Sequence, residues 1–99
     1  MVDFAFEAEV IHWRGPAPFF FVPVPPIHRG AIQQLAKRVS YGWGMIPVNA
    51  VIAGVDFSTA LFPKDEGYLL PLKATVRKQC AITAGDRIAV EMYIGVPKR

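Results

Sequence analysis

Apolar and polar side chains alternate along two segments, one near each end of the chain. Residues 2–13, VDFAFEAEVIHW, place Phe4, Phe6, Ala8 and Val10 on one face and the carboxylates of Asp3, Glu7 and Glu9 on the other. Residues 86–94, DRIAVEMYI, follow the same period of two. Successive side chains of a strand point to opposite sides of its sheet, so this period indicates a strand with one buried face. Both segments are therefore predicted to be strands.

Four shorter apolar stretches, separated by turn residues, complete the set of predicted strands. They are FFFVPV (19–24), IPVNAVIAG (46–54), VDFSTALF (55–62) and YLLPL (68–72). Their content of β-branched and aromatic residues favours strands. The Ala53-Gly54 pair predicts a tight hairpin between the second and third of them.

Two segments have helical rather than alternating spacing. Residues 25–40, PPIHRGAIQQLAKRVS, predict a three-turn helix in which Pro26 suits the first turn. Four apolar residues share one face of this helix: Ile32, Leu35, Ala36 and Val39. Residues 72–78, LKATVRK, predict a second, shorter helix.

The predicted fold is mainly β: a small closed six-stranded barrel with one three-turn helix and one short helix, formed by residues 1–99 as a single domain. Each strand must bury one face, and free sheet edges invite aggregation, so closing the sheet answers both demands. A weak internal repeat in the sequence adds a pseudo-two-fold axis to the predicted fold. Residues 20–24, FFVPV, match residues 68–72, YLLPL, and each stretch precedes a helical segment, a glycine turn and an alternating strand.

Composition narrows the class of protein further. Apolar residues make up 53% of the 99 residues and charged residues only 19%, which suits a real core and argues against disorder. No apolar run approaches the roughly 20 residues that span a bilayer, so no membrane partner is expected. The N-terminal segment MVDFAFEAEV lacks a basic region, so it is not a signal peptide and a cytoplasmic location is expected. The apolar content leaves self-association as a homo-oligomer open.

Five stretches together resemble a bacterial family, the domain of unknown function 1905. They are FEAEVIHW, GPAPFFFVPVP, GWGMIPVNAVIAG, STALFPKDEGYLLPLKATVRK and ITAGDRIAVEM. The most specific of them is GYLLPLKATVRK followed by a Gly-Asp turn. The resemblance covers nearly the whole chain and implies a small closed β-barrel with helices at its ends. It brings no established activity.

The second half of the chain is also similar to the swapped-hairpin half-domains of AbrB/MazE-type DNA-binding proteins. These share a proline after a strand, a short helix with an arginine, and a Gly-Asp turn into the next strand. Here both halves lie within one chain, so a dimer of halves is unnecessary and DNA binding is not favoured. The formal net charge of +3, from 11 basic and 8 acidic residues, does not by itself predict strong nonspecific binding to nucleic acid.

The main candidate site combines two cations with aromatic residues. Lys73 and Arg77 are four residues apart, so on a helix both would project from one face and could hold a carboxylate or phosphate. The alternative is that they are solvated, or paired with Asp56 or Asp86. Further aromatic residues could form a wall beside these cations and serve a planar ligand: Trp13, Phe19, Tyr41 and Trp43.

Other polar residues carry weaker signals. Asn49, Ser58 and Thr59 interrupt apolar strands, and one of them could face the barrel interior as part of a site. No metal spacing joins His12 or His28 to Cys80 or to a carboxylate cluster, so no metal is expected. No phosphate loop, nucleophile elbow or other catalytic signature is present, so no cofactor and no catalytic residue is assigned. Cys80 is interpreted as a small buried apolar residue.

These observations favour noncatalytic binding of a small anionic or planar ligand, or of a segment of a partner protein, beside Lys73, Arg77 and Trp43. Two other classes stay open. The first is AbrB-like DNA binding, in which further basic residues would join the two cations: Arg14, Arg29, Lys37 and Arg38. The second is an unrecognised enzyme, for which the sequence offers no matched acid and base.

Overall fold

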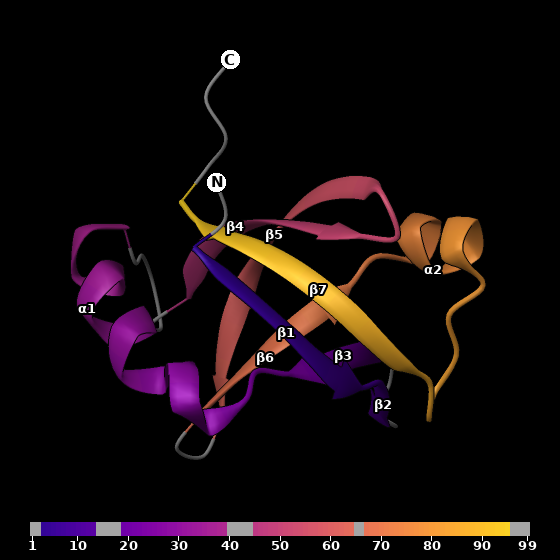
Figure 1. Cartoon of the computed structure of the whole chain (residues 1–99), viewed down its shortest axis with the longest axis horizontal. Coiled ribbons are helices and arrows are strands. Elements are labelled where there is room, and N and C mark those ends of the chain that lie inside the picture. The colour runs from indigo at the N-terminus through magenta and orange to yellow at the C-terminus, as the bar shows by residue number, and fades with distance from the viewer. Residues whose placement is uncertain (1–2, 14–18, 40–44, 65–66, 96–99) are drawn as a thin grey trace.

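The computed structural model describes residues 3–13, 19–39, 45–64 and 67–95, and no side chain of Trp13, Arg38 or Val39. In these ranges the chain forms seven strands and two α-helices, the first helix being preceded by a 3-10 turn at Pro26–His28. In chain order they are β1 (Phe4–Glu9), β2 (Ile11–Trp13), β3 (Phe19–Pro23), α1 (Arg29–Val39), β4 (Ile46–Ile52), β5 (Val55–Lys64), β6 (Gly67–Leu72), α2 (Ala74–Cys80) and β7 (Arg87–Ile94). Figure 1 shows the strands wrapped around one core.

The strands form one antiparallel sheet in the order β1-β7-β4-β5-β6-β3-β2. Its two edge strands, β1 and β2, are separated in sequence by Val10 alone. At Val10 the chain leaves the ladder: its N–H donates to the carbonyl of Asp86 at 2.8 Å, and its carbonyl accepts from the N–H of Gly85 at 2.8 Å. The bent strand therefore joins both ends of the sheet, which makes a nearly closed barrel.

The prediction of a mainly β barrel is thus confirmed, with seven strands in place of six. The difference arises at Val10, because the predicted strand over residues 2–13 pairs with β7 before the bend and with β3 after it. A single alternating stretch of sequence therefore counts as two strands.

The alternation of apolar residues defines the core. Along β4, Ile46, Val48, Ala50 and Ile52 are all buried, while the intervening residues are half-buried. The corresponding positions of the other long strands, among them Phe57, Leu61, Val90 and Met92, pack into the same cluster. No charged or polar residue among those described is buried. The interior is therefore purely apolar, and polar chemistry is confined to its surface and ends.

The two similar stretches of sequence, residues 20–24 and 68–72, lie in neighbouring strands that pair with each other. In β3 and β6, Phe20 lies opposite Leu72 and Val22 lies opposite Leu70, and the N–H of Val24 donates to the carbonyl of Tyr68 at 3.0 Å. The first residue of each stretch thus meets the last residue of the other, with Val22 and Leu70 at the centre. This register is that of a local two-fold axis.

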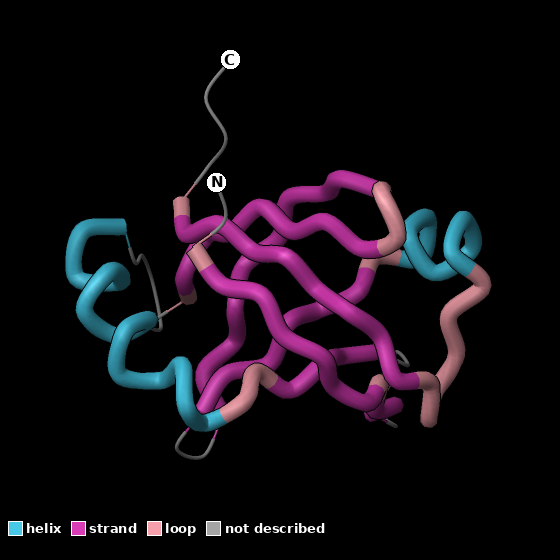
Figure 2. The backbone as a smooth tube through the Cα atoms, in the orientation of Figure 1, coloured by secondary structure: helices cyan, strands magenta, loops and turns pink. Residues whose placement is uncertain are grey.

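The helices lie at opposite ends of the barrel, α1 at one end of its long axis and α2 at the other (Figures 1 and 2). In α1, Ile32 and Ala36 are buried, but Leu35 is 38% exposed, so the buried stripe is narrower than predicted. The short helix α2 buries Val76 and ends at Cys80, followed by Ala81 as its C-cap with a left-handed φ of 53°. No helix in the described part of the chain is long and apolar enough to cross a membrane.

Candidate functional site

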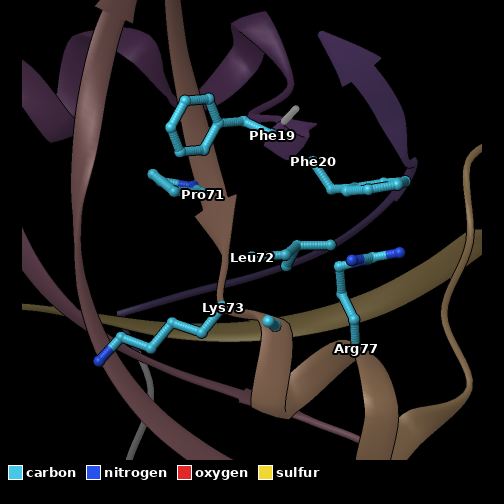
Figure 3. A pocket seen from close by; sticks show the side chains of 7 residues that line it. Phe19, Phe20, Pro71, Leu72, Lys73 and Arg77 are labelled. Carbon is cyan, nitrogen blue, oxygen red and sulfur yellow. The ribbon is translucent and has the colours of Figure 1, made fainter. Parts of the chain in front are cut away.

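A pocket of about 320 Å³ opens at the end of the barrel that carries α2. Its lining comes from the ends of β3 and β6 and from the first turn of α2, and consists of Phe19, Phe20, Pro71, Leu72, Lys73, Ala74 and Arg77 (Figure 3). Five of these seven residues are apolar and the other two are basic. The pocket therefore combines an apolar surface with positive charge.

The sheet register explains why these residues meet. Phe20 pairs with Leu72, so the start of β3 and the end of β6 lie at the same end of the barrel. The chain then turns at Lys73, whose backbone is extended, and enters α2 at Ala74. Arg77 follows one turn later, on the side of α2 that faces the strands.

Arg77 lies flat against an aromatic ring. Its guanidinium carbon is 3.4 Å from the centroid of the Phe20 ring, which is the geometry of a cation–π contact (Figure 3). The imidazole of His12 also stacks on Phe20, with ring centroids 4.6 Å apart and an interplanar angle of 24°. An imidazole at that distance would overlap the guanidinium if both occupied one face, so His12 and Arg77 lie on opposite faces of Phe20. Both faces of this ring are therefore occupied.

The guanidinium carries an unsatisfied donor. The Nε atom of Arg77 is buried and has no hydrogen-bond partner among the residues that the structure describes. A buried donor without a partner costs roughly 1–3 kcal/mol. The burial of Nε therefore lowers the stability of the fold at Arg77, and leaves the two terminal nitrogens as the donors that a ligand could meet.

No carboxylate among the described residues pairs with either cation. The two acids considered as partners are engaged elsewhere: Asp86 Oδ2 accepts from the backbone N–H of Thr83 at 2.9 Å, and Asp56 Oδ1 accepts from Asn49 Nδ2 at 2.8 Å. Within the described ranges, the positive charge of the pocket is therefore not neutralised by the protein.

Lys73 lines the pocket from a different backbone position than predicted. The prediction placed Lys73 and Arg77 on one helical face, but Lys73 precedes the helix and has an extended backbone, with φ −71° and ψ 148°. That premise is wrong, because α2 begins at Ala74, two residues after the predicted start and one residue after Lys73. Both residues nevertheless line the pocket, and the exposed side chain of Lys73 extends away from Arg77 (Figure 3).

The aromatic wall predicted from the sequence is described only in part. Tyr41 and Trp43 lie outside the described residues. Trp13 is in β2, opposite Phe19, but its side chain is likewise outside the description. Phe19 lines the pocket. Phe20 was not proposed, since nothing in the sequence indicates which aromatic ring Arg77 will meet.

The polar strand residues lie apart from this pocket. Asn49 Nδ2 donates to Asp56, and Asn49 Oδ1 accepts from Ser58 Oγ at 3.2 Å, which links the facing residues of β4 and β5. Thr59 is half-buried opposite Val48. Neither Asn49 nor Thr59 is among the lining residues.

Cys80 and the histidines have structural contacts. Cys80 is partly buried against the core, as interpreted from the sequence, with Sγ 3.6 Å from the carbonyl oxygen of Ile52. His28 stacks edge-on against Phe4, with ring centroids 5.1 Å apart. Across the residues that the structure describes, no three His, Cys, Asp or Glu side chains are grouped so that they could hold a metal ion.

Two of the basic residues invoked for DNA binding lie far from the pocket. Arg29 and Lys37 belong to α1, at the opposite end of the barrel from Lys73 and Arg77 (Figure 1). Arg14 and the side chain of Arg38 lie outside the described part.

Comparison with protein families identifies the chain. The model of a family described as "Domain of unknown function (DUF1905)" matches residues 6–92, which include the pocket and all seven strands in whole or in part. A search of curated proteins gives no match. Since the family model spans most of the 99 residues, the chain belongs to the DUF1905 family.

Proposed function

We propose that the protein binds a small anionic ligand, without catalysis, in the pocket between Phe19, Lys73 and Arg77. One observation carries this proposal. Two cations border an apolar pocket, and no described carboxylate compensates either of them. A bound anion would neutralise this positive charge.

Electrostatics supports an anion over a neutral ligand. Apolar walls exclude water and lower the local dielectric, so charge interactions there are stronger than at an open surface. The guanidinium is already held in place by Phe20, and therefore less side-chain freedom is lost when it binds a ligand. Lys73 is exposed, so it can adjust its position over the bound anion.

The composition of the lining favours binding over catalysis. The seven residues that line the pocket, as far as the chain is described, include no histidine, carboxylate, hydroxyl or thiol. General acid–base or nucleophilic catalysis needs such a group, or a lysine amine, held within hydrogen-bond reach of the substrate. The amine of the described lining belongs to Lys73, whose exposed side chain extends away from Arg77 and is not held in position (Figure 3). Docking of a partner segment and DNA binding stay predictions, and so does the cytoplasmic location.

A thermal-shift series tests the proposal. The melting temperature of the wild type should rise with the concentration of small carboxylates, acetate and phenylacetate, at constant ionic strength. The double variant Lys73→Ala/Arg77→Met should lose this response, whereas the control Lys78→Ala should keep it, because Lys78 is exposed on the same helix but does not line the pocket.

The control separates site binding from general screening. If Lys78→Ala lowers the response as much as the double variant does, the anions act on the net charge of the protein. If the wild type shows no response to either carboxylate, the pocket does not bind anions and the proposal falls.

A further inference from the structure

We infer that the ligand is an aromatic monocarboxylate, a planar ring on a short arm, with its ring against Phe19 and its carboxylate at Arg77. The inference rests on the proposed function, because it specifies which anion the same pocket takes. Three properties of the pocket lead to it: the chemistry of its walls, the exposed surface of Phe19, and the donors that Arg77 still offers.

The walls exclude ligands rich in hydroxyl groups. Apart from the two cations, the described lining offers only apolar side chains. A sugar or a nucleotide would bury hydroxyls and amides there without side-chain hydrogen-bond partners, and such burial is unfavourable. An apolar body loses nothing in the same place and gains from leaving water.

Phe19 provides the surface on which a ring can stack. Phe20 cannot do so, because His12 and Arg77 occupy its two faces. Phe19 is 54% exposed, and its ring contacts Phe21 with centroids 6.2 Å apart, so it has support within the sheet and accessible surface at the pocket (Figure 3). Aromatic pairs prefer the offset or edge-on arrangements that such a partly supported ring permits.

Arg77 selects a carboxylate. Its Nε is covered, so a ligand can reach only the two terminal nitrogens of the guanidinium. Two coplanar N–H donors match the two oxygens of one carboxylate in a bidentate pair. A phosphate presents more oxygens than these donors satisfy, and Lys73 is the sole other charged group of the described lining.

The volume sets the size of the ligand. At about 320 Å³, the pocket is at the lower end of the range of about 300–1,000 Å³ that ligand sites occupy. A single ring with a short carboxylate arm suits this space better than a fused or extended molecule does.

Titrations followed by calorimetry and by amide chemical shifts test the inference with four probes: phenylacetate, acetate, phenylacetamide and inorganic phosphate. We expect phenylacetate to bind at least about tenfold more tightly than acetate, which corresponds to about 1.4 kcal/mol. We expect the same margin over phenylacetamide, which has the ring without the charge, and over inorganic phosphate.

Variants locate the ring. Phe19→Ala should reduce the advantage of phenylacetate over acetate to about twofold or less. The matched control is Phe62→Ala, which removes another exposed aromatic residue of the same sheet, 40% exposed, that does not line the pocket. It should leave the affinity unchanged, and the amide spectra of both variants verify that the fold is intact.

The outcomes separate this inference from the proposed function. If acetate or phosphate binds as tightly as phenylacetate, and Arg77→Met abolishes that binding, the anion site stands and the aromatic class is wrong. If Phe62→Ala weakens phenylacetate as much as Phe19→Ala does, the ring lies elsewhere and the inference is also overturned. If phenylacetamide equals phenylacetate, or no carboxylate binds, both the inference and the proposed function fail.

Discussion

Replacing Arg77 by methionine tests whether the guanidinium of Arg77 serves ligand binding or the stability of the fold. Methionine has a similar length and can lie over Phe20, where a sulfur–aromatic contact contributes about 0.3–1.5 kcal/mol. It carries no charge and no donor. The variant therefore removes the guanidinium while it leaves the packing between α2 and β3 largely filled.

The expected change in the free energy of unfolding is small because two effects oppose each other. The variant loses a cation–π contact of about 0.5–2 kcal/mol, at a guanidinium carbon 3.4 Å from the ring centroid. It also removes the buried, unpaired Nε, whose desolvation costs about 1–3 kcal/mol. With the sulfur–aromatic contact added, the middle of these ranges gives a net gain, and we expect a stability equal to that of the wild type or up to about 2 kcal/mol above it. For a domain of 99 residues, each kcal/mol corresponds to about 4–8 °C in melting temperature.

Urea and thermal unfolding followed by circular dichroism measure this change against two reference variants. Lys78→Met alters an exposed cation of the same helix and should stay within about 0.5 kcal/mol of the wild type. Val76→Ala removes two methyl groups from a side chain that is 2% exposed. It should destabilise the protein by about 2 kcal/mol, from lost burial and the cavity left behind.

A loss of about 2 kcal/mol or more in Arg77→Met, comparable with that in Val76→Ala, would refute the reasoning. Arg77 would then stabilise the packing of α2 against Phe20, and its unpaired Nε would not indicate a role in binding. If the variant is at least as stable as the wild type but no longer binds carboxylates, Arg77 serves binding and not stability. Such a residue does not contribute to the stability of the fold.

Two further predictions concern the architecture around the site. Phe20→Leu removes the ring that His12 and Arg77 share, and should lower the stability by about 1–3 kcal/mol in urea unfolding; an unchanged midpoint would show that the stack is energetically neutral. Gly30→Ala and Gly85→Ala should act in opposite directions, because an added Cβ has open space at both positions but Gly85 has a φ of 92°. We expect the helical Gly30 variant to gain up to about 1 kcal/mol and the Gly85 variant to lose about 1–2 kcal/mol; equal shifts in melting temperature would contradict the strain argument.

The sequence predicts the barrel well because its core is built from uninterrupted alternation. In β4 burial alternates strictly from Ile46 to Ile52, although Pro47 and Val51 at the half-buried positions are apolar too. The bend at Val10 could not be predicted in this way. Its side chain continues the alternation of β1, while its backbone bonds to Gly85 and Asp86, far away in sequence.

The candidate site was predicted less completely, for a related reason. Charge and spacing single out Lys73 and Arg77, and the structure brings both to one pocket. The stacking of Arg77 on Phe20 depends on how α2 packs against β3, and composition carries no signal of that contact. The helical prediction for Lys73 failed because nothing in LKATVRK marks where the helix starts, and no side chain caps it.

The antiparallel match of β3 with β6 has a consequence for how the site comes into being. Phe20 belongs to β3 in the first half of the sequence, whereas Lys73 and Arg77 follow β6 in the second half. Neither half contains a complete pocket, so the cavity exists only after the halves have docked. A bound ligand would therefore contact both halves of the sequence, and its binding free energy would add to the stability of the pairing between β3 and β6.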